Sequence, residues 1–377
     1  NEYMEKRTAG DEIKQKNRTS IFQLLRRHEG LSRQDIVTML RLSLPTVTQN
    51  LVELMEEGIV EECGSIGNTG GRRAKSYAIN CQARVAIGLD ITKNHISVAV
   101  VDMKGNVIAH QRVRFPFART DEYAKKLADM VEWGVAETQI DRKSILGVGI
   151  GVPGLVSADH DRVIYGETLN FSGAEVDEFS KYIPYPTALY HDVPAACFAE
   201  TWNNKDIKNA FYIMINNSLG GAIYVNHHLY SGDTTRSGEI GHITLVPNGR
   251  RCYCGKLGCV DTYCSTGNLA SLADGNLGAF FDLLEAGDPQ AKYVWTEYIG
   301  YLATAINMIR MLFDCDVILG GYIGEYIDTY IDDLRKLIAE KNPFDDNSDY
   351  LLPCKCKTAA VATGAALGYI SSFLETI

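Results

Sequence analysis

The stretch VAIGLDITKNHISVAVVDMKGNVIAHQRVRF, residues 85–115, decides how the body of this chain folds. It contains three apolar runs, over residues 85–91, 96–101 and 107–115, and the first includes an acid near its end. The segment between the last two runs holds the Gly and Asn that turns favour. The pattern predicts three consecutive strands joined by short turns.

A helix and a further strand are predicted after this stretch, the helix over residues 121–138 and the strand, ILGVGIGV, over residues 145–152. The order strand-strand-strand-helix-strand is typical of the actin-like (ribonuclease H-like) fold of sugar kinases, in which two α/β lobes enclose a cleft. We expect lobe one over residues 81–190, lobe two over residues 191–357, and a C-terminal helix within residues 358–377 that returns to lobe one.

Length and charge agree with more than one domain. The chain has 377 residues, of which 46% are hydrophobic and 22% charged, enough for two or three domains. Its net charge is −10, but residues 1–80 carry 12 Lys and Arg against 11 Asp and Glu, so this part is the one suited to nucleic acid. No run reaches the roughly 18 apolar residues of a membrane span, and the N-terminal segment lacks the apolar core of a signal peptide. We expect a cytoplasmic protein with no membrane partner.

The first 80 residues predict a winged helix-turn-helix. Apolar spacing predicts a helix over residues 19–27, Ser32 and Ser43 are N-caps for two more helices, and strands over residues 59–63 and 74–79 flank a turn that ends in Gly-Gly-Arg-Arg. Small polar residues of the third helix suit base edges and the basic wing suits phosphates. The alternative is a small helical domain that binds protein. Candidate DNA contacts are Arg33, Ser43, Thr46, Thr48, Gln49, Arg72, Arg73 and Lys75, with Asn50 and Glu53 on the same outward face.

The run from LSRQDIV to GGRRAKSYAI, residues 31–79, resembles the N-terminal domain of ROK-family transcriptional repressors (repressor, open reading frame, kinase). Three segments of the body are also similar to motifs of this family: GVGIGVPGLV (147–156), HDVPAACFAE (191–200) and GEIGHITLVPNGRRCYCGKLGCVD (238–261). The resemblance implies a sugar effector, either a monosaccharide or a sugar phosphate. It also implies a homodimer or dimer of dimers on a pseudo-palindromic operator.

A cluster of cysteines predicts a metal site. Cys252, Cys254 and Cys259 lie within eight residues, and His242 lies ten residues upstream of the first. Three thiolates and one imidazole suit a structural Zn²⁺ ion, which leaves no position open for catalysis. We expect one zinc per chain; the alternative is that these cysteines act as small hydrophobic residues.

The resemblance also implies a sugar site. Asp192 matches the family's aspartate that contacts a sugar hydroxyl and acts as base in the kinases, and Glu239 and His242 match the E-x-G-H pair that binds hydroxyls. Two positions depart from the kinase pattern, because His191 replaces an asparagine and Asp261 a glutamate. The full expected set is Asn170, His191, Asp192, Glu239, His242 and Asp261.

The phosphate loops of the family's kinases are not matched. Asp90 is followed by Ile91-Thr92-Lys93 where kinases have Gly-Gly-Thr, so Cβ atoms occupy positions where backbone N–H groups would reach phosphates. We therefore expect no catalytic residues and interpret the chain as a sugar-responsive regulator, a repressor of genes for carbohydrate uptake and catabolism. One alternative is a bifunctional ATP-dependent sugar kinase of the hexokinase type that also binds DNA. Another is a corepressor-type binder of a sugar phosphate or a protein partner.

Overall fold

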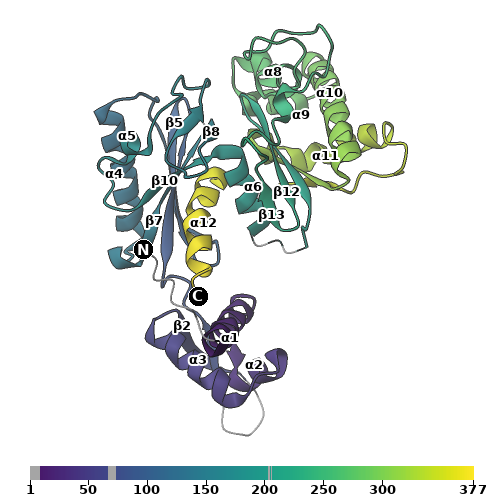
Figure 1. Ribbon diagram of the computed structural model, residues 1–377. Helices are drawn as coiled ribbons and strands as arrows, with labels where there is room; N and C mark the ends of the chain where they lie inside the picture. The colour runs from purple at the N-terminus through teal and green to yellow at the C-terminus, as the bar shows by residue number, and fades with distance from the viewer. Residues whose placement is uncertain (1–8, 67–73, 203, 205) are drawn as a thin grey trace.

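The computed structural model describes residues 9–66, 74–202, 204 and 206–377. A small helical domain lies at one end of the molecule, and two α/β lobes lie side by side above it (Figure 1). Strands and helices contribute together to both lobes, so the predicted α/β class with an N-terminal winged helix-turn-helix is confirmed. No helix in these described ranges is long and apolar enough to cross a membrane.

The N-terminal domain packs three helices against a small sheet. The helices are α1 (Ala9–Arg26), α2 (Arg33–Leu40) and α3 (Leu44–Glu56), and the sheet has the order β1-β3-β2, with β1 (Leu31–Ser32), β2 (Val60–Ile66) and β3 (Ala74–Ile79). As predicted, the Ser32 and Ser43 hydroxyls accept N–H bonds at the starts of α2 and α3.

Two details of this domain differ from the predictions. Helix α1 begins at Ala9, ten residues before the predicted start, because residues 9–18 are mostly polar and show little apolar periodicity. Asn50 is 3% exposed rather than outward, and its side-chain N–H donates to the Thr46 carbonyl oxygen at 2.8 Å. A buried amide needs such a partner, which here lies one helical turn back.

The first lobe is built on a five-stranded sheet of order β10-β7-β4-β5-β6. Helix α4 (Asp121–Thr138) covers one face and α12 (Ala360–Leu374), which ends the chain, covers the other (Figure 1). Glycines let α12 approach closely: a Cβ atom at Gly88 would lie 1.6 Å from the Ala362 carbonyl oxygen. The strands are β4 (Val85–Ile91), β5 (His95–Asp102), β6 (Val107–Arg114), β7 (Ile145–Val152) and β10 (Thr187–His191), and β8 (Leu155–Val156), β9 (Val163–Tyr165) and α5 (Val176–Ser180) lie between β7 and β10 in the chain.

The second lobe has its own five-stranded sheet, of order β13-β12-β11-β14-β15. Helix α6 (Asp192–Trp202) lies between the lobes and packs on both α12 and β12 (Figure 1). The strands are β11 (Ala210–Ile215), β12 (Leu219–Val225), β13 (His228–Tyr230), β14 (Asp316–Gly321) and β15 (Leu351–Pro353). The other helices are α7 (Asp261–Cys264), α8 (Gly267–Ala270), α9 (Leu277–Glu285), α10 (Pro289–Phe313) and α11 (Ile327–Ala339).

One hydrophobic core joins the N-terminal domain to the first lobe. Phe22 and Leu25 of α1 belong to the same buried cluster as Leu367 and Ile370 of α12 and the C-terminal Ile377. The side-chain amide of Gln15 also donates to the Ile377 carbonyl oxygen. Because α12 shares this core with α1 and also packs on the first sheet and on α6, it links the N-terminal domain to the region between the lobes.

Candidate functional site

The first candidate site is the outward face of α3. Gln49 is exposed and its side-chain N–H donates to Glu53 at 3.2 Å, while Ser43 and Thr46 share a hydroxyl–hydroxyl hydrogen bond of 2.8 Å. Thr48 is half-buried on the same helix. Glu53 also pairs with Lys14 of α1 at 2.9 Å, so its charge is compensated. The start of α3 and the turn around Gln49 therefore present small and uncharged polar groups.

The basic candidates of this domain fall in three groups. The Arg33 guanidinium lies over the Tyr77 ring, 5.3 Å from its centroid, so this residue is half-buried rather than fully outward. Lys75 is exposed and pairs with Glu62 across the hairpin at 2.9 Å. Arg72 and Arg73 lie outside the described residues.

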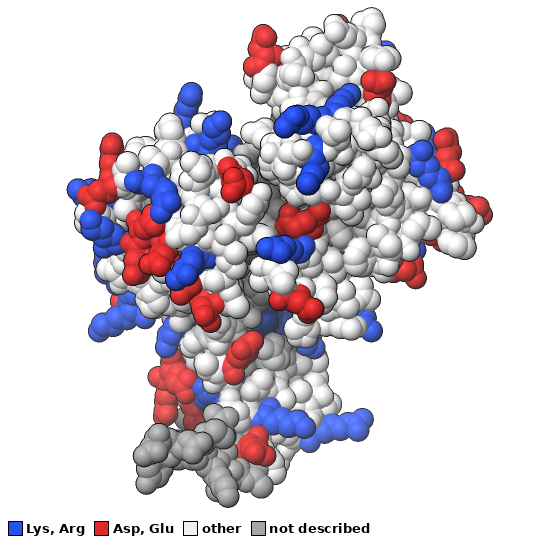
Figure 2. All heavy atoms as spheres, turned by 45° about the horizontal axis from the view of Figure 1, so that its top comes forward, with Lys and Arg blue, Asp and Glu red and all other residues white. Residues whose placement is uncertain are grey.

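The second candidate site is a cavity between the two lobes, at the carboxyl ends of β7 and β10. Figure 2 shows the hollow between the lobes, with cationic and anionic side chains interspersed around it. Both sheets contribute to the cavity, because the turn between β11 and β12 forms the wall opposite the end of β10. The polar side chains that line it belong to Glu167, Thr168, His191, Asp192, Ser218, Glu239, His242 and Tyr253, with Tyr165 beside them.

Asp192 stands at the start of α6, at the centre of this cavity. Its Oδ1 accepts the Val193 N–H at 2.8 Å and lies 3.5 Å from the His191 Nε2. Burial raises the pKa of Asp192 well above its usual range, and the nearby Asp90 and Glu239 carboxyls add to the effect. Burial lowers the pKa of His191 to about 4, so this imidazole is neutral at pH 7. A hydroxyl that donated to Asp192 would relieve the cost of its charge.

Glu239 and His242 flank a short 3-10 turn on the second lobe. Burial raises the pKa of Glu239. The two ring nitrogens of His242 face different partners: Nε2 lies 3.2 Å from the Tyr253 hydroxyl, and Nδ1 lies 3.9 Å from the Cys252 Sγ. One imidazole therefore belongs both to the cavity between the lobes and to the cysteine cluster.

The cysteine cluster brings four possible metal ligands together. The four ligand atoms of His242, Cys252, Cys254 and Cys259 all lie within 4.8 Å of one another. The Sγ atoms of Cys254 and Cys259 are 3.7 Å apart, close to the roughly 3.8 Å that two thiolates on a tetrahedral Zn²⁺ require. The site could therefore hold a metal ion with few side-chain movements.

Two glycines shape the loop that carries these cysteines. Gly255 and Gly258 have φ values of +86° and +80°, which residues with a Cβ atom rarely adopt. A Cβ atom at Gly258 would also lie 1.7 Å from the Val246 carbonyl oxygen, whereas a Cβ atom at Gly255 would have no atom within 4 Å. Gly255 is therefore restricted by its backbone conformation alone, and Gly258 by its backbone conformation and by the space around it.

Two expected sugar contacts lie away from the cavity lining. Asn170 is exposed in a turn with φ +51° and does not line the cavity. Asp261 is 5% exposed, and its Oδ2 accepts the Leu219 N–H at 2.6 Å. Asp261 thus fixes the β11–β12 turn, which forms a cavity wall. The sequence analysis did not identify five other residues that line the cavity: Tyr165, Glu167, Thr168, Ser218 and Tyr253. Of these, Tyr253 could have been found, because it lies between Cys252 and Cys254 in the predicted metal motif.

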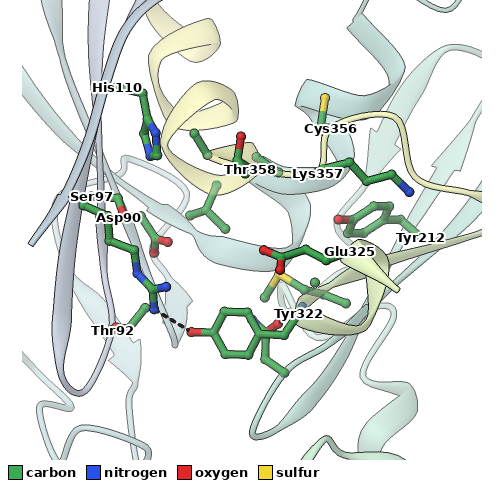
Figure 3. A pocket seen from close by; sticks show the side chains of 17 residues that line it. Asp90, Thr92, Ser97, His110, Tyr212, Tyr322, Glu325, Cys356, Lys357 and Thr358 are labelled. Atoms are coloured by element: carbon green, nitrogen blue, oxygen red, sulfur yellow. Dashed lines mark hydrogen bonds between the residues drawn. The ribbon is translucent and has the colours of Figure 1, made fainter. Parts of the chain in front are cut away.

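A second cavity between the lobes lies beside the turn that follows Asp90 (Figure 3). Arg112 of β6 reaches across it and donates to the Tyr322 hydroxyl of the second lobe at 3.4 Å. Burial raises the pKa of Asp90 to about 7, and Arg112 opposes the rise. Thr92 turns back to its own hairpin, where its hydroxyl donates to the His95 carbonyl oxygen. This cavity is thus bridged by an arginine–tyrosine contact between the lobes.

Comparison with known proteins identifies the family of the body and the class of the N-terminal domain. The sequence model of the ROK family matches residues 86–368, and a model described as winged helix-turn-helix DNA-binding matches residues 14–61. The xylose repressor of Bacillus spizizenii is 26% identical over 97% of both chains. The transcriptional regulator NagC of Escherichia coli is 24% identical over 67% of this chain and 63% of its own.

Solved structures share the fold. A ROK family transcriptional regulator, described as a homologue of the E. coli Mlc protein, superposes with a TM-score of 0.74 and 23% identity over 97% of this chain and 99% of its own. A ROK family glucokinase from Streptomyces griseus, in complex with glucose and AMPPNP, gives a TM-score of 0.61 and 23% identity over 75% of this chain and 98% of its own. The chain therefore belongs to the ROK family and carries an N-terminal winged helix-turn-helix domain.

Proposed function

We propose that this protein is a sugar-responsive transcriptional repressor of carbohydrate genes. The observation that carries the proposal is that one core joins a winged helix to a lobe whose strands end at a cavity lined by Asp192, Glu239 and His242. Relatives that align over nearly the whole chain are named xylose repressors, which supports the same reading. We assign DNA contact to the start of α2, to α3 and to the wing, through Arg33, Ser43, Thr46, Thr48, Gln49, Arg72, Arg73 and Lys75.

A sugar suits the cavity because sugar hydroxyls both donate and accept hydrogen bonds. The carboxyls of Asp192 and Glu239 accept, the Tyr253 hydroxyl can do either, and the neutral His191 offers one donor and one acceptor. A buried polar group left unpaired costs roughly 1–3 kcal/mol, so this set selects among hydroxyl patterns. Both lobes line the cavity, and a sugar that fits it best when the lobes close shifts the protein toward that closed state.

A structural zinc ion completes the proposal for the second lobe. The donor set of three thiolates and one imidazole fits Zn²⁺, and His242, Cys252, Cys254 and Cys259 would hold it, one ion per chain. A bound Zn²⁺ would fix the tautomer and the orientation of the His242 ring. With Nδ1 held in this way, His242 presents Nε2 to Tyr253 and to the cavity.

A repressor without kinase activity is supported by the turn after Asp90. There Thr92 bonds back to His95, and the Arg112–Tyr322 contact spans the neighbouring cavity. Phosphoryl transfer depends on positioning and charge stabilisation, so a base at Asp192 alone supplies only about 10²–10⁴-fold of rate. The competing function is a bifunctional sugar kinase, which Asp192 and the kinase-like fold favour.

The experiment that tests the proposal has two parts. A thermal-shift panel of monosaccharides and sugar phosphates identifies the effector, because a saturating ligand raises stability by RT ln(1 + [L]/Kd). Protein with that sugar, ATP and Mg²⁺ is then assayed for sugar phosphate, and none is expected. Turnover near 1 s⁻¹, about the low end for kinases, would support the bifunctional enzyme instead.

We further propose that the repressor acts as a homodimer or dimer of dimers on a pseudo-palindromic operator, with a monosaccharide or sugar phosphate as effector.

A further inference from the structure

A groove of about 610 Å³ lies where the winged helix meets the two lobes. Four separate parts of the chain form it: the end of α1, the β5–β6 turn, the segment after α6 and the segment before α12. It shares no residue with the sugar cavity. The residues that line it are Arg26, Arg27, Lys104, Asn106, Trp202, Asn204, Asp206 and Lys355.

The groove concentrates positive charge in a chain whose net charge is −10. Among the residues that the structure describes, four cationic side chains and one carboxylate, that of Asp206, line the groove. Within the ranges that the structure describes, none of these four cations forms a salt bridge. Other cations of the N-terminal domain do: Lys14, Arg18 and Lys75 each pair with a glutamate. Unpaired cations that converge from three segments of the chain repel one another, and a bound anion would relieve this repulsion.

Arg26 is held in place for such an anion. Its guanidinium lies over the Trp202 ring, 4.4 Å from the centroid, and the Trp202 indole N–H donates to the Lys104 carbonyl oxygen at 3.2 Å. Burial, and then the neighbouring Arg27, lower the pKa of Arg26. A stacked guanidinium keeps its N–H edge available for acceptors in one plane.

The opposite wall is equally fixed. The backbone N–H groups of Lys355 and Cys356 donate to the two carboxylate oxygens of Glu200, at 2.6 and 2.9 Å. This clamp leaves the Lys355 side chain exposed at the groove. Arg26 and Lys355 are therefore presented by two rigid supports, one in the winged helix and one beside α12.

We propose that this junction groove binds a small phosphorylated metabolite, whose phosphate lies among the two arginines and the two lysines. Guanidinium groups match phosphate oxygens with paired N–H bonds, and lysines add charge. Asn106, Asn204 and Asp206 supply partners for the hydroxyls of such a molecule. Asp206 would repel a second phosphate, which makes the groove less suited to the continuous backbone of DNA.

A ligand in the groove would link the winged helix to the body of the protein. Its phosphate would contact Arg26 and Arg27 of the N-terminal domain together with Lys104 and Lys355 of the body. Its affinity therefore depends on how the N-terminal domain sits on the first lobe. By reciprocity, the ligand would favour that arrangement over others.

The test is calorimetric titration of the full chain at low ionic strength with inorganic phosphate, glucose 6-phosphate and glucose. We expect both phosphates to bind, and to bind the Asp192→Ala variant equally well, which separates this site from the sugar cavity. The triple variant Arg27→Gln/Lys104→Gln/Lys355→Gln should bind about tenfold more weakly, the order expected when charge-assisted contacts from two exposed cations and the half-buried Lys104 are lost. The control Lys143→Gln/Lys336→Gln/Lys341→Gln, with the same charge change at exposed sites elsewhere, should bind like the wild type.

Either of two results would overturn the proposal: neither phosphate binds the wild type, or the groove variant and the control bind phosphate equally. If phosphates do not bind and the groove variant also loses operator affinity and salt dependence, the groove belongs to the DNA backbone. None of them bears on the sugar response, so the repressor function stands or falls separately.

Discussion

At the scale of single residues, the two buried aspartates of the cleft have raised pKa values, and their effect on stability can be measured. Asp90 has a pKa of about 7 in the folded protein, against roughly 3.9 in an unfolded chain. The folded state thus binds more protons between these values, and its stability falls as pH rises from about 4 to 7.

Replacing Asp90 by asparagine should remove this pH-dependent penalty. We expect Asp90→Asn to be more stable than the wild type at pH 8. At pH 3.5 we expect no gain, because the Asp90 carboxyl is then mostly protonated in the folded and in the unfolded state. Urea unfolding at several pH values gives the two stability curves. A difference in free energy of unfolding that stays constant from pH 3.5 to 8 would contradict the assignment.

Tyr253 lines the proposed sugar cavity beside His242, and its hydroxyl lies 3.2 Å from the His242 Nε2. Tyr253→Phe should weaken sugar binding by roughly 0.5–1.5 kcal/mol, the usual net value of one hydrogen bond, and leave the metal content unchanged. Calorimetry and elemental analysis measure the two quantities. Loss of metal together with sugar affinity would show that Tyr253 supports the loop rather than the ligand.

The residue scale also shows what a sequence can and cannot reveal about a site. Asp192, Glu239 and His242 were predicted because they lie in recognisable motifs, and the structure brings them to one cavity. The Arg112–Tyr322 contact joins residues 210 positions apart and has no local signature, so only the fold reveals it.

At the scale of elements, the cysteine loop offers a matched pair of glycines. Gly255→Ala adds only backbone strain, of the order of 1–3 kcal/mol, whereas Gly258→Ala adds a clash with the Val246 carbonyl oxygen. We expect zinc near one equivalent in the wild type and a larger fall in melting temperature and metal content for Gly258→Ala than for Gly255→Ala. Cys254→Ser, which removes a ligand, should lose the metal and weaken sugar binding through His242. Equal effects of the two glycine variants, or a wild type free of zinc, would contradict the proposed site.

Helix α3 and the wing should affect DNA binding differently. Gln49→Ala should reduce discrimination between operator and mismatched DNA by about 1–3 kcal/mol, because an amide reads a base edge. Lys75→Ala should instead weaken all sequences alike and reduce the slope of log K against log salt by about 0.9. Titrations at several salt concentrations separate the two. If Gln49→Ala changed only the salt slope, α3 would not be the reading element.

Elements with strong apolar patterns were predictable and those without were not. Strands β4 and β7 and helix α4 have the predicted bounds, because each is a continuous apolar run or a clear helical stripe between turn signals. The first half of α1 lacks such a stripe, and polar contacts support it instead: Gln15 donates to the Ile377 carbonyl oxygen and Lys14 pairs with Glu53.

At the scale of the whole molecule, α12 is the element on which the account depends. It packs against α6 at the edge of the sugar cavity and shares a core with α1 of the winged helix. A rotation of the lobes about α6 can therefore reach the DNA-binding domain through packed side chains. Coupling of this kind is a difference in sugar affinity between two arrangements of the same chain.

The measurement that tests this account most directly is operator affinity as a function of sugar concentration, by fluorescence anisotropy, for the wild type and Asp192→Ala. The account predicts that the effector weakens operator binding of the wild type by roughly 5–150-fold, the range of 1–3 kcal/mol of coupling. Asp192→Ala should bind the operator as tightly as the wild type and show no response to the sugar. An equal sugar response in both proteins, or no response in the wild type at a sugar concentration that saturates its cavity, would contradict it.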